Sequence, residues 1–317
     1  MVIQILLVVV GFACLVFGAN WLVDGASSLA KKYNVSDLAI GLTIVAFGTS
    51  APELVVNIVG SIKGYSDIVV GNILGSNNFN LYIILGISGL ILPITVQSST
   101  AWKEIPISLL VAVLMLFFIN DFSFSEPTSL SRMEGFFMLV LFVLFLYYVF
   151  RQMKNEQNIQ SNIVLKSTPK IWGLIAIGLA GLIIGGQLVV TNAVNVANSL
   201  GVSEKIIGLT IVAAGTSLPE LVTSVVAATK KNSDIAIGNV VGSNIFNILL
   251  ILAISSIIAP IDYNPKFNLD IYILIGGTIF LLVAMVTGKR RKLDRWEAAL
   301  LLAFYIAYTV YLVMKEI

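Results

Sequence analysis

The chain has 317 residues, of which 58% are apolar and only 11% are charged, with a net charge of +2. Its mean hydropathy of +0.97 is too high for a water-soluble protein, so the composition predicts a polytopic helical membrane protein. The sequence has no histidine and one cysteine, Cys14, which excludes intrachain disulfides, zinc–histidine sites and a Ser-His-Asp triad. We therefore expect no enzyme and no bound cofactor.

About ten apolar segments are long enough to cross a bilayer, which requires roughly 17 to 25 residues of helix. The segments lie at 3–29, 37–61, 68–94, 104–119, 133–150, 171–199, 205–229, 235–260, 269–287 and 296–314. The first one lacks a basic leader and a small-residue cleavage site, so we expect a retained helix and not a cleaved signal peptide. No soluble domain is left over.

Basic residues predict the orientation, because Lys and Arg are in excess on the cytoplasmic side. With ten spans, one side collects 14 of the 19 basic residues, among them Lys31, Lys230 and Lys231. Both termini are then expected to be extracellular or periplasmic. The polar loop 151–170 is expected to be a cytoplasmic linker between an N-terminal five-helix half, 1–150, and a C-terminal half, 171–317.

The two halves contain similar segments. A shift of 167 residues aligns Val35–Asn80 with Val202–Asn247, and 28 of these 46 positions are identical. Polar blocks repeat best, such as Gly71-Asn72 with Gly238-Asn239. Because each half has an odd number of spans, the second copy must enter the membrane from the opposite side, which is typical of secondary transporters with a site at the repeat interface.

Two carboxylates, Glu53 and Glu220, are the only acidic side chains deep within a predicted span. A charge at this depth costs about 2.5 to 3.5 kcal/mol or more, so it normally faces a cavity and a partner. No Lys, Arg or His lies at comparable depth, which makes a bound cation the natural partner.

Each glutamate ends the hexamer Gly-Thr-Ser-x-Pro-Glu, at 48–53 and at 215–220. Pro52 and Pro219 cannot donate a backbone hydrogen bond, so both helices are expected to kink and to expose carbonyl oxygens. The neighbouring Thr and Ser add hydroxyl oxygens. The sequence thus predicts an oxygen-rich pocket.

The helix that follows each glutamate is expected to place an asparagine side-chain oxygen at the depth of that glutamate. Asn80 and Asn247 each stand 27 residues after a glutamate and close the segments 75–80 and 242–247. Calcium takes six to eight carboxylate, carbonyl and amide oxygens, and two carboxylates balance its charge. Sodium also favours oxygen ligands and can compete for the same site.

The hexamers and the Gly-Ser-Asn segments resemble the repeats of the calcium/cation antiporter superfamily, in the short prokaryotic form of its sodium/calcium exchanger branch. The resemblance implies alternating access in the cell membrane, usually three sodium ions moving inward against one calcium moving outward. It also implies an ion site formed by Thr49, Ser50, Glu53, Ser76, Asn80, Thr216, Ser217, Glu220, Ser243 and Asn247, with carbonyls near Ala46 and Ala213.

Some members of this branch carry Asp where Asn247 stands, and so does its potassium-dependent subgroup. The amide here leaves two negative charges in the site and argues against potassium co-transport. A proton/calcium antiporter is the main alternative, although that branch typically has Asn and no proline in its hexamer. A calcium-permeable channel lined by carboxylates is a third possibility. Calcium, sodium and lipid are the expected partners, with no nucleic acid and no obligatory protein partner.

Overall fold

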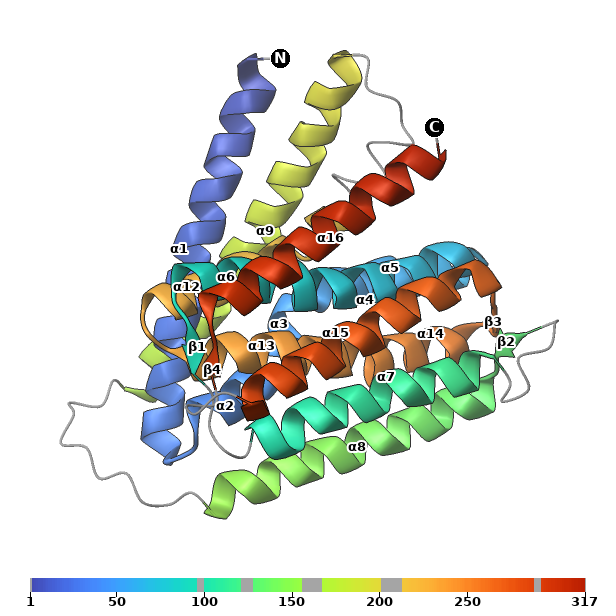
Figure 1. Ribbon diagram of the computed structural model, residues 1–317. Helices are drawn as coiled ribbons and strands as arrows, with labels where there is room; N and C mark the ends of the chain where they lie inside the picture. The colour runs from blue at the N-terminus through green and yellow to red at the C-terminus, as the bar shows by residue number, and fades with distance from the viewer. Residues whose placement is uncertain are drawn as a thin grey trace.

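The computed structural model describes residues 2–95, 100–120, 128–155, 167–200, 213–287 and 292–316. Nearly all of these residues are helical, as the composition predicts (Figure 1). The α-helices are α1 (Val2–Tyr33), α2 (Asp37–Ile40), α3 (Ala46–Thr49), α4 (Ala51–Ile62), α5 (Ser66–Asn78), α6 (Leu85–Ile91), α7 (Ile105–Ile119), α8 (Arg132–Asn155), α9 (Thr168–Ser199), α11 (Ala213–Gly215), α12 (Leu218–Thr229), α13 (Ser233–Phe246), α14 (Ala253–Ile258), α15 (Asn268–Thr287) and α16 (Arg295–Glu316). Helical turns of other pitch are η1 (Gly41–Val45), η2 (Phe79–Ile84), η3 (Thr100–Glu104), η5 (Asn247–Leu252) and η6 (Pro265–Phe267).

Seven helices in the described ranges are long and apolar enough to cross a membrane, or eight if a bent pair is counted as one span. They are Val2–Tyr33, Ser66–Ile91, Trp102–Ile119, Arg132–Gln152, Thr168–Ala197, Ser233–Ile258 and Pro265–Met285, with Asp37–Thr49 plus Ala51–Ile62 as the bent pair. Each coincides with an expected apolar segment. The expected segment 205–229 lies partly outside the described residues, and ten spans remain a prediction.

The hexamers break their helices as expected. The two parts of the first bent span meet at 48°, and Ser50 at the break has φ −80° and ψ 9°. Ser217, between α11 and α12, has nearly the same angles, φ −89° and ψ 8°. Pro52 and Pro219 lie in the first turns of α4 and α12, where helix N–H groups have no intrahelical partner and the missing N–H costs little. The kinks therefore fall two residues before each proline.

Wide helical turns of the π type interrupt the two helices that follow the glutamates. Asn80 is the second residue of η2, and Asn247 is the first residue of η5. In such a turn the backbone hydrogen bonds skip one residue further, and π turns occur frequently at functional sites. Both asparagines predicted to bind a cation therefore lie where the regular helix is interrupted.

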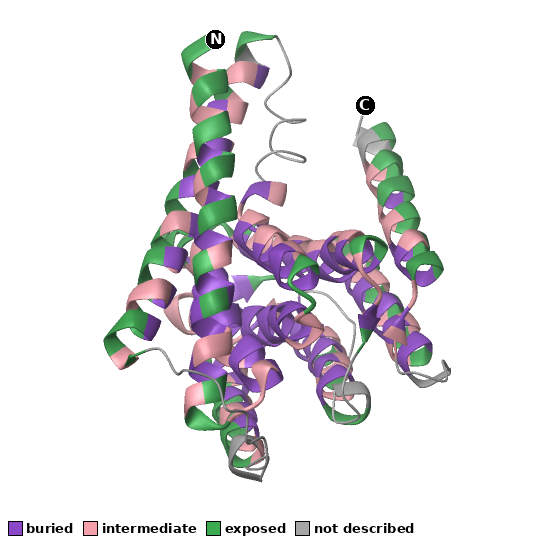
Figure 2. Cartoon of the chain, turned by 90° about the vertical axis from the view of Figure 1, so that its left-hand side faces the viewer, coloured by how far each residue is buried: buried purple, intermediate pink, exposed green. Residues whose placement is uncertain are grey.

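Helices α1 and α9 pack against one another and cross the remaining helices steeply (Figure 1). Glycines line their contact: a Cβ added at Gly178 would lie 2.6 Å from the backbone N of Leu22, and one added at Gly18 would lie 2.8 Å from the Gly178 carbonyl oxygen. Backbone approach of this kind is typical of helix pairs in membranes. The large apolar side chains of Val9 and Phe17 on α1 are both 60% exposed, as expected for lipid contact. Figure 2 shows exposed residues along much of this helix, which begins at the N-terminus.

The described residues include four strands of two residues each, which an all-helical prediction omits. β1 (Ile94–Thr95) pairs antiparallel with β4 (Lys292–Leu293), and β2 (Ser129–Leu130) pairs antiparallel with β3 (Ile261–Asp262). Each pair joins a loop of the first half of the chain to a loop of the second half.

Candidate cation-binding site

The two predicted carboxylates are buried at corresponding positions of the two halves. Glu53 is 0% exposed and Glu220 is 1% exposed. Each is the third residue of its helix, α4 or α12, immediately after the break. The amide groups and dipole of a helix N-terminus favour negative charge, which lowers the cost of holding a carboxylate there.

Serines of the opposite half hold each carboxylate. Ser50 Oγ donates to Glu220 Oε1 at 3.0 Å, and Ser217 Oγ donates to Glu53 Oε1 at 3.1 Å. Ser76 Oγ also lies 3.3 Å from Glu53 Oε1. The two hexamers therefore meet at their centres, and each glutamate is oriented by the other copy of the motif.

The asparagine segments also interlock. Asn80 Nδ2 donates to Asn244 Oδ1 at 3.0 Å, and Asn247 Nδ2 donates to Asn77 Oδ1 at 2.9 Å. All four side chains are at most 4% exposed. Asn80 and Asn247 thus use their NH2 groups on neighbouring protein atoms and keep their side-chain oxygens for another partner.

Six of the predicted site residues carry a buried oxygen atom without a hydrogen-bond partner, and seven more such atoms lie elsewhere in the part of the chain that the structure describes. The six atoms are Glu53 Oε2, Glu220 Oε2, Asn80 Oδ1, Asn247 Oδ1, Thr216 Oγ1 and Ser243 Oγ. An unpaired buried acceptor is costly, so buried acceptors normally have a partner. A bound cation would satisfy the carboxylate and amide oxygens together.

Threonine and alanine at the two breaks are placed less symmetrically. Thr49 is buried, and its hydroxyl lies 3.0 Å from Asn239 Oδ1 and 3.3 Å from the carbonyl oxygen of Ala46. Thr216 is half-buried. Ala213 opens α11 at the edge of the described residues, which begin again there after residue 200.

Asn239 is a buried residue of this region that the predicted ligand set omits. Its Nδ2 donates to the Glu220 carbonyl oxygen at 3.2 Å and to Ser224 Oγ at 2.9 Å, while its Oδ1 receives the Thr49 hydroxyl. Its counterpart Asn72 donates to Asn57 Oδ1 at 2.7 Å, and Asn57 is the residue that corresponds to Ser224. The repeated Gly-Asn block was the available signal, but it does not tell that the Asn239 oxygen accepts the Thr49 hydroxyl.

The site rests on two carboxylates only. In the described ranges no group of three or more Asp, Glu, His or Cys side chains is arranged to hold a metal ion. A ligand set of two carboxylates and several neutral oxygens suits a hard cation such as calcium, whose coordination tolerates irregular geometry.

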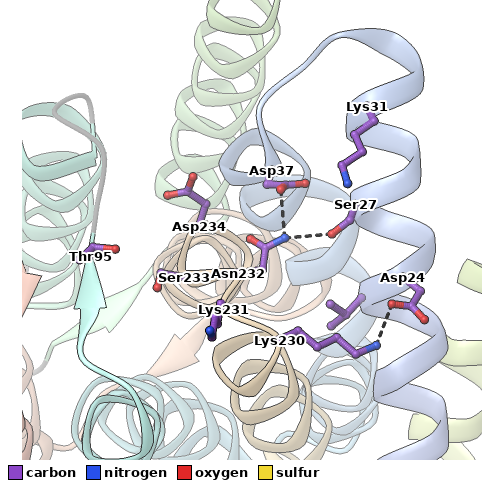
Figure 3. A pocket seen from close by; sticks show the side chains of 11 residues that line it. Asp24, Ser27, Lys31, Asp37, Thr95, Lys230, Lys231, Asn232, Ser233 and Asp234 are labelled. Atoms are coloured by element: carbon purple, nitrogen blue, oxygen red, sulfur yellow. Dashed lines mark hydrogen bonds and ion pairs between the residues drawn. The ribbon is translucent and has the colours of Figure 1, made fainter. Parts of the chain in front are cut away.

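A separate polar pocket of about 520 Å³ lies where α1 and α2 meet the turn between α12 and α13 (Figure 3). Asn232 Nδ2 donates to Ser27 Oγ at 2.9 Å and to Asp37 Oδ2 at 3.0 Å, and Lys230 forms an ion pair of 2.7 Å with Asp24. None of the predicted ion ligands lines it. The pocket brings together three lysines that the charge pattern assigns to one side of the membrane: Lys31, Lys230 and Lys231.

Comparison with known proteins gives the family. The family model described as sodium/calcium exchanger protein matches residues 3–151 and 170–314. The CaxA protein of Alkalimonas amylolytica is 38% identical over 97% of this chain and 98% of its own length. The sodium/calcium exchanger MaX1 of Methanosarcina acetivorans is 32% identical over 98% of both chains. A solved structure of the sodium-calcium exchanger NCX_Mj matches with a TM-score of 0.83 at 32% identity and 97% coverage of both chains.

These matches extend over nearly the whole chain and agree with the helical fold and its apolar spans. The protein is a multi-pass transporter of the cell membrane. It belongs to the sodium/calcium exchanger family.

Proposed function

We propose that this protein exchanges sodium, moving inward, for calcium, moving outward, by alternating access. The observation that carries the proposal is the set of buried, unpartnered oxygens on Glu53, Glu220, Asn80 and Asn247. Two carboxylates neutralise one calcium ion or two sodium ions, so the two cations compete for shared ligands. Competition for one site is what an exchanger requires.

In this proposal calcium lies between Glu53 and Glu220, with the amide oxygens of Asn80 and Asn247 beside it. Sodium sites flank the calcium site. The residues proposed to complete them are Ser76 and Ser243, the Thr-Ser pairs Thr49-Ser50 and Thr216-Ser217, and the carbonyls of Ala46 and Ala213.

Ten spans in two inverted halves, with cytoplasmic linker 151–170 and outward-facing termini, complete the proposal. Support comes from contacts that repeat at the 167-residue shift. Ser50–Glu220 and Ser217–Glu53 are related in this way, and so are the two bonds between the asparagine segments. The family model also matches two segments, on either side of the linker. Helices α1 and α9, joined along their glycines, are the proposed mobile unit.

The proton/calcium antiporter is the alternative with the nearest chemistry, because carboxylates can exchange calcium for protons as well as for sodium. Sodium is favoured because both hexamers carry proline and because MaX1 and NCX_Mj are described as sodium/calcium exchangers. A channel is less favoured, since its ions would need a continuous path and these oxygens are enclosed.

Calcium uptake into proteoliposomes tests the proposal. Vesicles loaded with sodium and diluted into sodium-free medium should accumulate calcium, whereas vesicles loaded with potassium should not. A third preparation carries only a pH gradient. Uptake driven by the pH gradient alone would establish the proton alternative, and uptake that ignores both gradients would indicate a channel. Vesicles that hold the Glu53→Gln variant provide the blank.

A further inference from the structure

Four buried asparagines, Asn77, Asn80, Asn244 and Asn247, are linked to one another by hydrogen bonds. Besides the two side-chain bonds described above, Asn77 Nδ2 donates to the Asn244 carbonyl oxygen, and Asn244 Nδ2 donates to the Asn77 carbonyl oxygen, both at 3.3 Å. Each of Asn77 and Asn244 therefore donates its NH2 group to the backbone of the other half. The side-chain oxygen of Asn77 accepts from Asn247, and that of Asn244 accepts from Asn80.

The backbone contacts fix the direction of the whole pattern. A carbonyl oxygen can only accept, so Asn77 must turn its NH2 group toward residue 244. The side-chain oxygen of Asn77 then faces Asn247, which must donate its NH2 group to that oxygen. The oxygen of Asn247 is left on the other side of the amide, buried and without a protein partner. The same steps lead from Asn244 to the free oxygen of Asn80.

We propose that Asn77 and Asn244 are positioning residues, which hold the amides of Asn247 and Asn80 so that oxygen and not NH2 faces the transported cation. This inference rests on the proposed function, because it assigns a role to residues that act through two proposed ligands. An amide without such an anchor can turn either its oxygen or its NH2 group toward the cation. An amide held by a backbone-anchored neighbour offers the acceptor in every cycle.

Asn78, the residue next to Asn77, shows what a buried asparagine without this role looks like. It is 1% exposed, and its Nδ2 donates to the Asp270 carbonyl oxygen on α15 at 3.1 Å. Its counterpart in the second half is Ile245. The second half therefore dispenses with an amide at this position, which makes Asn78→Ile a matched control for the loss of a buried amide.

The test measures the calcium concentration that gives half-maximal uptake into sodium-loaded proteoliposomes. Asn77→Ala should raise it by about fivefold, the equivalent of one neutral hydrogen bond, and Asn78→Ile should leave it unchanged. On an Asn247→Ala background the Asn77→Ala change should have no further effect, because no amide is left to position. In the other half, Asn244→Ala takes the place of Asn77→Ala, and Asn80→Ala takes the place of Asn247→Ala. These two variants test the proposal if Asn77→Ala does not fold.

Two results would overturn the positioning role. One is an equal half-saturating concentration in Asn77→Ala and Asn78→Ile. The other is an Asn77→Ala effect that persists undiminished when residue 247 is alanine, which would mean that Asn77 acts by general stability. If the unmodified protein takes up no calcium under any gradient, the proposed function fails instead, so the two failures are distinguishable.

Discussion

Replacing Glu53 by glutamine is the sharpest perturbation of the proposed site, since it changes one atom and one charge. Glu53 Oε1 receives the hydroxyls of Ser217 and Ser76, so the glutamine oxygen should occupy that position. The NH2 group then replaces Oε2, the oxygen that has no protein partner. The substitution therefore removes a charge and also turns a donor toward the ion.

The gross attraction between calcium and one carboxylate oxygen at about 2.4 Å is about 14 kcal/mol at an effective dielectric constant of about 20. Desolvation of the ion and of the carboxylate cancels most of it. If about 4 kcal/mol survives, calcium affinity falls about a thousandfold. Equilibrium binding of radioactive calcium to purified protein in detergent measures the change, with Glu134→Gln, at the start of α8, as the control. A Glu53→Gln protein that binds calcium within about threefold of the parent refutes the shared site.

Three further substitutions test neighbouring parts of the argument. Asn247→Asp places a carboxylate against Asn77 Oδ1, which is held as an acceptor. Sodium-driven calcium uptake should therefore become more pH-dependent than in the parent. An unchanged pH profile would place residue 247 outside the site. Thr49→Val removes the hydroxyl that donates to Asn239 Oδ1 and should raise the half-saturating calcium concentration severalfold. Thr43→Val, the control, loses only a bond to the Ala39 carbonyl oxygen one turn earlier and should leave that concentration unchanged. Gly178→Ala should lower the thermal unfolding midpoint in detergent by the equivalent of about 1 to 3 kcal/mol, because the new methyl group meets the backbone of α1. Gly173→Ala is the control, since its methyl group would have open space and should not destabilise the protein. Equal midpoints of the two variants would refute the close packing.

Depth in an apolar segment was enough to predict that Glu53 and Glu220 are buried, because the cost of a buried charge does not depend on knowing the fold. Proline predicted both broken helices for a similar reason, since a missing N–H is a local property. The position of each break relative to its proline, however, is not a local property. The chain leaves the helix at Ser50 and Ser217, so that proline falls in the first turn of the next helix, where it is tolerated.

Other features depend on partners that the sequence does not reveal. Asn77 and Asn78 are adjacent and identical in kind, yet one contacts the opposite asparagine segment and the other contacts α15. The wide turns η2 and η5 have no periodicity of their own, and the strand pairs are two residues long. Only the 167-residue repeat distinguishes the two asparagines in the sequence, since Asn77 corresponds to Asn244 in the second half, whereas Asn78 corresponds to Ile245.

Each glutamate accepts a hydrogen bond from a serine of the other half, and this arrangement helps to explain why the proposed transporter would exchange ions and not leak them. Glu53 is oriented by Ser217 and Glu220 by Ser50, so neither half can assemble the site alone. A serine hydroxyl contributes only about 1 kcal/mol, whereas an uncompensated carboxylate at this depth costs several times more. The serines can therefore position the two carboxylates but cannot neutralise them. A site that has released calcium should stay unfavourable until sodium, or a proton, replaces it. Movement of the empty site across the membrane would then be the slow step, which couples the exit of one cation to the entry of another.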